Sequence, residues 1–134
     1  MLIDVVWDKP EKTVLRFVRH PGWSAKDYHA AIDQAVEMAQ TVPYRVHMIQ
    51  DSTRTTEMPP NALQHFRIGN AKLAPYSGKS IIVGDSYLMK TLFDMFKVME
   101  IDMSEHFTFV THIDKARDLL AEEPNPLRDQ QTNH

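Results

Sequence analysis

The chain has 134 residues, of which 43% are hydrophobic and 25% are charged, a balance typical of one globular domain with its own core. Its net charge of −3 gives no excess of positive charge, so nucleic acid is not an expected partner. The chain has no cysteine, which excludes disulfides and thiolate chemistry and favours a cytoplasmic location. No apolar run approaches the roughly 20 residues of a membrane helix, so we expect no membrane insertion.

Two strand-like segments open the chain and predict a β-hairpin. Residues 2–7 and 13–19 are rich in Val, Ile, Leu and Phe, and a polar, turn-like segment separates them. Side chains in the second segment alternate, so Leu15, Phe17 and Arg19 share one face of the predicted strand.

The first helix has a clear start signal. Ser24 is a good N-cap residue, and Asp27 follows at the third helical position, which is a capping-box pattern. Trp23 and Tyr28 occupy the two positions of a hydrophobic staple across the same helix start. Pro43 ends the helical pattern near residue 40.

Three later strand-like runs each end in polar residues and lead into a helical pattern. Residues 44–50 run into Asp51, Ser52 and Thr53, residues 80–83 into Gly84, Asp85 and Ser86, and residues 107–110 into Thr111 and His112. We expect Pro59–Pro60 to form the first turn of the second helix and the third helix to span about residues 87–100. A short last helix follows His112.

The order of elements is therefore ββαβαβαβα. Strands that alternate with helices predict an α/β fold with a mixed, mostly parallel sheet, an N-terminal β-hairpin and about four helices. We expect a single domain over residues 1–122 and a polar, flexible tail over residues 123–134.

The chain combines the opening hairpin, Trp23-Ser24 at the first helix, Asp51-Ser52 and Gly84 at two strand ends, and a closing Phe-Thr and Ala116-Arg117 segment. This combination resembles the SpoIIAA-like branch of the STAS fold (sulfate transporter and anti-sigma antagonist domains). The resemblance covers roughly residues 2–122 and implies a STAS-like, STAS/SEC14-type domain.

The resemblance implies a regulatory function. In anti-sigma factor antagonists, a partner kinase phosphorylates a Ser or Thr in an Asp-Ser-Ser-Gly type loop after the strand, and the added charge blocks binding. In this chain Thr53-Arg54-Thr55-Thr56 replaces the small Ser-Gly ending, and prolines open the next helix. The SpoIIAA-like branch also resembles lipid-binding CRAL-TRIO folds, which implies an apolar ligand as another option.

The polar residues at the strand ends form the first candidate site. If the strands are parallel, these ends meet at one edge of the sheet, where open α/β sheets bind ligands. The cluster comprises Asp51, Ser52, Thr53, Asp85, Ser86 and His112. Helix capping accounts for such residues most economically, a ligand site is the next interpretation, and acid–base catalysis is the last.

The sequence predicts neither a metal nor a cofactor. The seven histidines show no ligand spacing, and mid-strand His47 is best interpreted as a semi-buried residue with satisfied hydrogen bonds. With only four glycines, the chain contains no glycine-rich phosphate loop.

The third helix is the second candidate site because its apolar arc is unusually wide. The arc comprises Leu88, Met89, Leu92, Phe93, Met95, Phe96 and Met99. Methionines adapt to irregular partners, so an exposed patch here would serve self-association or a partner protein. Packing beneath a neighbouring element and an apolar ligand pocket behind the helix are the alternatives.

Our leading hypothesis is a non-enzymatic, cytoplasmic STAS-like regulatory or protein-interaction module. It would bind a partner protein or a second copy of itself as a homodimer, through its second and third helices and the loop after Asp51. Phosphorylation of Ser52, Thr53, Thr55 or Thr56 would tune this binding.

Two other hypotheses remain open. The first is a small apolar ligand or lipid bound in a cavity beneath the third helix. The second is an enzyme that uses His112 with Asp51 or Asp85. Exposure of Met89 and Phe93 would favour a protein partner, and burial around a void would favour a ligand.

Overall fold

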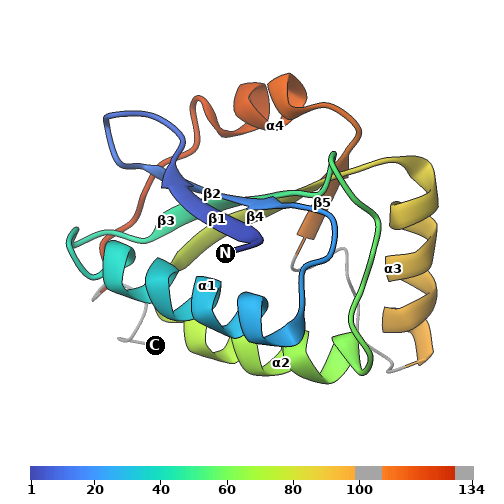
Figure 1. Ribbon diagram of the computed structural model, residues 1–134. Helices are drawn as coiled ribbons and strands as arrows, with labels where there is room; N and C mark the ends of the chain where they lie inside the picture. Colours follow the sequence, from blue (N-terminus) through green and yellow to red (C-terminus); the bar gives the residue numbers. More distant parts are fainter. Residues whose placement is uncertain (99–106, 129–134) are drawn as a thin grey trace.

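The computed structural model describes residues 1–98 and 107–128. In these residues the expected order ββαβαβαβα is confirmed (Figure 1). The elements are β1 (Ile3–Trp7), β2 (Val14–Arg19), α1 (Ala25–Ala39), β3 (Val46–Asp51), α2 (Ala62–Leu73), β4 (Ser77–Val83), α3 (Ser86–Val98), β5 (Phe107–Val110) and α4 (Ile113–Leu120). No helix in this part of the chain is both long and apolar enough to cross a membrane.

The strands form one mixed sheet in the order β1-β2-β3-β4-β5. The β1–β2 hairpin is antiparallel, and each later strand pairs in parallel with its neighbour. The carboxyl ends of the parallel strands meet at one edge, where the Ser52 N–H donates to Val83 O at 2.8 Å and the Gly84 N–H donates to Val110 O at 3.1 Å. The prediction of a mostly parallel sheet with one common edge is therefore confirmed.

Helices cover both faces of the sheet. In Figure 1, α1 and α2 lie on one face and α4 lies on the other. Along β3, Met48 belongs to the core beneath α1 and α2, whereas the next residue, Ile49, belongs to the core beneath α4. Helix α3 packs against Ile82 of β4, on the same side as α1 and α2. This side therefore carries three helices and the wider core.

The start of α1 has the predicted capping box. The Asp27 N–H donates to Ser24 Oγ at 3.2 Å, and the Ser24 N–H donates to Asp27 Oδ2 at 2.9 Å. The predicted staple residues Trp23 and Tyr28 are both buried, with ring centroids 6.4 Å apart. The capping and the staple together fix two large aromatic side chains next to the end of β2.

Two helix boundaries differ from their predictions. Helix α2 begins at Ala62, so the prediction that Pro59–Pro60 form its first turn is wrong. Pro60 disfavours helical backbone at the residue before it, and Asn61 has a left-handed φ of 58°, so the helix begins only after both. The end of the predicted third helix, with Met99, lies outside the described residues.

Residues 123–128, which begin the predicted tail, lie against the domain. The Arg45 N–H donates to Pro126 O at 2.8 Å, and the Asn125 side-chain amide donates to Thr13 O and Arg45 O at 3.1 and 2.8 Å. Arg128 also donates from its backbone to Pro43 O at 3.2 Å. These bonds hold residues 125–128 against backbone groups next to the starts of β2 and β3.

Candidate ligand-binding cavity

A cavity of about 60 Å³ lies between the sheet, the three helices on its wider side and the loop that follows β3. That loop passes between the sheet and α3 on its way to α2 (Figure 1). The apolar part of the wall comprises Met58, Phe66, Ile82, Leu88, Leu92, Phe96 and Phe107. The cavity is therefore in the place where an apolar ligand was expected, beneath the third helix.

Helix α3 supplies one side of this wall. Leu88, Leu92 and Phe96 recur every four residues, so they lie along one stripe of the helix, and all three are buried. Gly84, just before α3, gives Leu88 its space, because a Cβ at residue 84 would lie 2.5 Å from Leu88 Cδ2. The tight turn after β4 thus brings the first residue of the stripe onto the sheet.

Aromatic rings from α1 and α2 form the opposite side. The Trp23 and Phe66 rings are stacked with centroids 6.4 Å apart, and Tyr28 meets Phe66 edge-on at 5.3 Å. Tyr28 can approach α2 because residue 69 is glycine, where an added Cβ would lie 2.1 Å from the Tyr28 hydroxyl oxygen. Burial raises the pKa of Tyr28 to about 12, although the nearby Arg19 charge acts in the opposite direction.

The polar part of the wall centres on Arg19, the last residue of β2. Its side chain is buried, with 8% of the residue exposed, and Nη1 donates to Gln50 Oε1 at 2.9 Å. The guanidinium carbon lies 5.2 Å from the centroid of the Trp23 ring, in cation–π geometry. Burial lowers the pKa of Arg19, and the nearby charges of Tyr28 and Asp51 act in the opposite direction. No carboxylate of residues 1–98 or 107–128 lies within ion-pair distance of Arg19.

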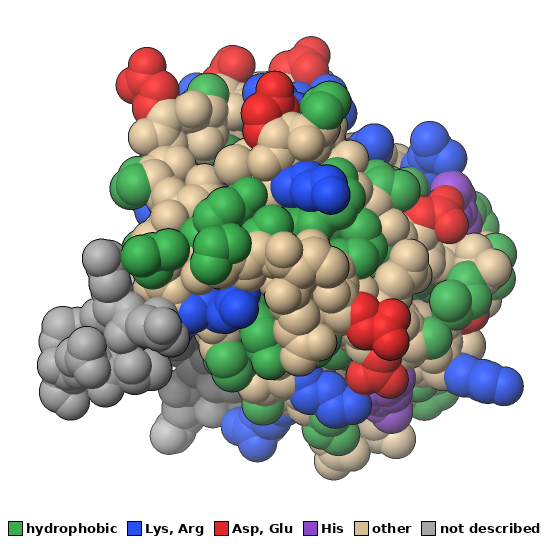
Figure 2. All heavy atoms as spheres, turned by 90° about the vertical axis from the view of Figure 1, so that its left-hand side faces the viewer, with side chains coloured by type: hydrophobic (Ala, Val, Ile, Leu, Met, Phe, Trp, Pro, Cys, Tyr) green, Lys and Arg blue, Asp and Glu red, His purple; other side chains and the backbone are tan. Residues whose placement is uncertain are grey.

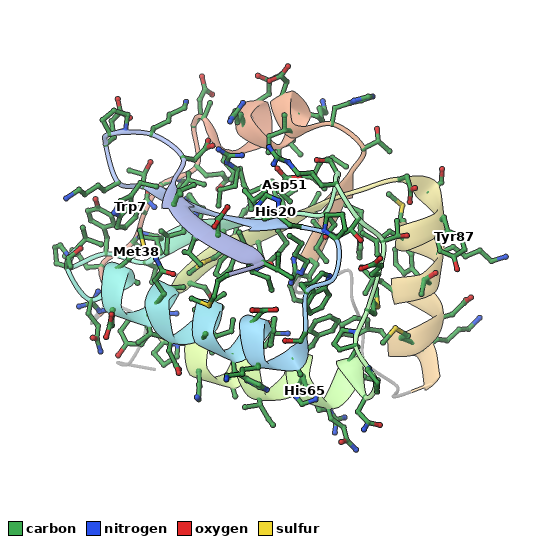
Figure 3. All side chains as sticks on the ribbon, in the orientation of Figure 1. Trp7, His20, Met38, Asp51, His65 and Tyr87 are labelled. Carbon is green, nitrogen blue, oxygen red and sulfur yellow. The ribbon has the colours of Figure 1, made fainter. Side chains whose placement is uncertain are left out.

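The acidic residue closest to Arg19 in the strand pairing, Asp51, lies on the other face of the sheet. Gln50 pairs with Phe17 and Asp51 with Val18, so Gln50 shares the face of Arg19 while Asp51 faces α4 (Figure 3). Asp51 Oδ2 lies 3.6 Å from Arg16 Nη1. Strand alternation therefore separates this carboxylate from the cavity.

A second, wider hollow of about 450 Å³ adjoins the cavity between α2 and β4. The two share Gln50, Phe66, Asn70, Phe96 and Phe107 as a common wall. Small-molecule sites usually enclose about 300–1,000 Å³. The inner cavity can hold only part of a ligand, and the adjoining hollow has the volume for the remainder.

The structure places the predicted strand-end cluster at one edge but gives its members different environments. Asp85 Oδ1 accepts from the Leu88 N–H at 2.8 Å, so it caps α3 as the capping interpretation predicts. Ser86 begins α3 and is exposed, and His112 is the exposed N-cap residue of α4. Among the described hydrogen bonds, none joins His112 to Asp51 or Asp85.

The hydroxyl-rich loop after β3 closes over the cavity. Ser52 is buried in the cavity wall, whereas Thr53 and Thr56 are exposed. Thr53 donates from its N–H and its hydroxyl to Asp51 Oδ1, at 3.1 and 2.7 Å, and Thr55 Oγ1 accepts from the Glu57 N–H at 3.1 Å. The loop is also attached to the start of α1, because the Gly22 N–H donates to Glu57 Oε2 at 2.5 Å.

The predicted interaction helix divides between core and surface. Leu92 and Phe96 are buried against the cavity, Met89 is half-buried, and Phe93 is 44% exposed with its ring 4.8 Å from that of Phe109. Tyr87 projects from α3 away from the sheet (Figure 3). On the face of the molecule away from α3, acidic, basic and hydrophobic side chains are mixed (Figure 2).

The histidines include one correct prediction and one pair that sequence reasoning missed. His47 is buried, and its Nδ1 accepts from the Lys79 N–H at 3.0 Å, as expected for a satisfied residue. The missed pair joins α1 to α2, with His29 Nε2 2.8 Å from His65 Nδ1. In residues 1–98 and 107–128, no group of three or more metal-ligating side chains could hold an ion.

Arg19 is the main residue of the cavity wall that sequence reasoning did not select. Its alternation with Leu15 and Phe17, two large apolar side chains, already indicates that Arg19 faces the core. A charged residue at the end of that face was the signal that could have identified the site.

No protein-family model matches the chain, and no curated protein matches its sequence. The fold and the site therefore define it as an α/β protein with a mixed sheet, five-stranded in the described residues, and a partly open cavity.

Proposed function

We propose that this protein is a non-enzymatic module that binds a small, largely apolar molecule in the cavity beneath α3. The observation that carries this proposal is the cavity itself, whose wall consists mostly of apolar side chains, several of them buried. Protein interiors are normally close-packed, and a partly open pocket with a mostly apolar wall favours an apolar guest. The adjoining hollow of about 450 Å³ supplies room for a larger ligand.

The resemblance to STAS domains supports a regulatory use of this binding. The loop after β3 supplies Ser52 and Met58 to the cavity wall and also carries the exposed hydroxyls of Thr53 and Thr56. A ligand that contacts the wall would therefore stabilise one conformation of the loop, and a partner could recognise that conformation. Binding and signalling would then be two properties of the same segment.

A titration with octanol tests the apolar site directly. Trp23 lies in the wall, so its fluorescence reports occupancy once the other tryptophan is removed by Trp7→Phe. We expect saturable octanol binding that Leu92→Phe abolishes, because the larger ring occupies the cavity. Leu119→Phe, at a position 41% exposed on α4, is the matched control and should bind like the parent protein. Equal binding by both variants would contradict the proposal.

Docking of a partner protein or a second copy is the second candidate function. It is favoured by the exposed ring of Phe93 and its neighbour Phe109, which leave an aromatic pair on the surface. Phe93→Ser should abolish self-association or partner capture, as measured by light scattering and pull-down, whereas Lys90→Ser on the same helix should not. A monomeric, unmodified protein without partners would refute this candidate.

A further inference from the structure

We infer that the ligand of this cavity carries a single carboxylate, which binds to Arg19. This inference rests on the proposed function, because it assigns a chemical class to the ligand of the same cavity.

Arg19 is a buried cation that forms no ion pair with any carboxylate of residues 1–98 or 107–128. Arginine is rarely buried unless an anion accompanies it, because an unpaired charge in apolar surroundings is costly. In the described part of the chain, Asp51 faces the other side of the sheet and pairs with Arg16. Glu57 lines the cavity, but its Oε2 accepts from the Gly22 N–H and it forms no described ion pair with Arg19. The position of a counter-ion is therefore left for a ligand.

Several hydrogen-bond donors lie at this end of the cavity. A guanidinium has five N–H donors, and one hydrogen bond from Arg19 is described, to Gln50 Oε1. Trp23, which lies beneath the guanidinium, has a buried Nε1 without a hydrogen-bond partner in the same residues. The hydroxyls of Tyr28 and Ser52 also belong to the wall. This set favours a ligand group that only accepts hydrogen bonds.

A monocarboxylate fits this set better than a phosphate does. The planar fork of a guanidinium matches the two oxygens of a carboxylate, and one positive charge neutralises one negative charge. A phosphate dianion would retain an unpaired charge next to Leu92 and Phe96 in an apolar wall. The rest of the ligand would extend along that wall toward the adjoining hollow.

The test compares octanoate with octanol, which share a chain and differ at the head group. In the Trp7→Phe protein we expect octanoate to bind roughly 30-fold more tightly, as a charge-assisted hydrogen bond predicts. Arg19→Met should remove this preference while octanol binding stays within about twofold. Arg16→Met, in the same strand but on the other face, should retain the preference. Phenylacetate in place of octanoate distinguishes an aromatic from an aliphatic acid.

The outcomes separate the two proposals. Equal affinity for octanol and octanoate in the parent protein would overturn the carboxylate assignment and leave the apolar site intact. Absence of binding by octanol, octanoate and phenylacetate would overturn the proposed function as well. If Arg19→Met fails to fold by circular dichroism, Arg19→Lys, which retains the charge but loses the planar fork, should weaken octanoate binding by roughly 5- to 10-fold. An unchanged octanoate affinity in Arg19→Lys would refute bidentate recognition.

Discussion

Replacing Gly69 with alanine tests the packing that forms the aromatic side of the cavity. The new Cβ would lie 2.1 Å from the Tyr28 hydroxyl oxygen and 2.7 Å from each of two ring carbons. Tyr28 is 4% exposed and packs against Trp23 and Phe66, so its ring cannot move outward without displacing them. The remaining free space for the ring is the cavity of about 60 Å³.

Two effects of opposite sign determine how much Gly69→Ala changes the free energy of unfolding. Alanine stabilises a helix interior by about 1 kcal/mol relative to glycine, whereas an overpacked core loses about 1–3 kcal/mol. Because all three clashing atoms belong to one buried ring, we place the steric cost near the upper limit. The predicted net loss in the free energy of unfolding is about 1–2 kcal/mol. Ligand affinity should fall as well, because the displaced ring enters the site.

Urea denaturation followed by circular dichroism measures the stability change. Ala71→Gly, at an exposed position of the same helix, calibrates the helix-propensity effect and should cost about 1 kcal/mol. Adding Tyr28→Phe to Gly69→Ala removes the closest clashing atom and should recover part of the loss. A Gly69→Ala protein that is more stable than the parent by about 1 kcal/mol would refute the close approach of α1 and α2.

Three further predictions concern charges inside the fold. Because the pKa of Tyr28 is raised to about 12, its contribution to stability is complete below about pH 10 and is lost between pH 10 and 12. In Tyr28→Phe, the midpoint of urea denaturation should therefore change less with pH over this range than in the parent protein. Equal pH dependence in the two proteins would contradict this prediction. The side chain of Asp8 is 1% exposed, and its carboxylate lies 2.9 Å from Arg117 Nη2 and 3.2 Å from Arg16 Nε. Asp8→Ala should therefore lower the free energy of unfolding, measured by urea denaturation, by about 1.5–3 kcal/mol. A decrease below about 0.5 kcal/mol would contradict a stabilising role for these ion pairs. Burial lowers the pKa of His47, so the protein should lose stability as the pH falls below about 6.5. In thermal melts, the melting temperature of His47→Gln should fall less over this pH range than that of the parent protein. An equal fall in both proteins would contradict a contribution of His47 to the pH dependence.

Local signals were sufficient to predict the order of elements and the mixed, mostly parallel sheet. The capping box at Ser24, the alternation in β2 and the polar strand ends each depend on residues close together in the chain. They were therefore visible without knowledge of the tertiary structure. The start of α2 was mispredicted because two adjacent prolines resemble a first helical turn, while the left-handed Asn61 depends on how the loop returns to the sheet.

The site was less predictable because it depends on side-chain direction. Asp51 and Ser52 are adjacent in sequence, but alternation sends Asp51 toward α4 and Ser52 into the cavity. A cluster defined by the strand edge alone therefore mixed residues of both faces. The His29–His65 contact joins residues 36 positions apart and depends on the register between two helices, which no local pattern reveals.

The central claim is that the cavity beneath α3 binds a small apolar acid through Arg19. Native mass spectrometry of the gently purified protein, before and after addition of octanoate, tests it most directly. We predict a 1:1 complex with a small acid, either co-purified or formed with octanoate, and a weakening of the octanoate complex in Arg19→Met to the level of octanol binding. A parent protein that keeps the bare chain mass under both conditions would contradict the claim.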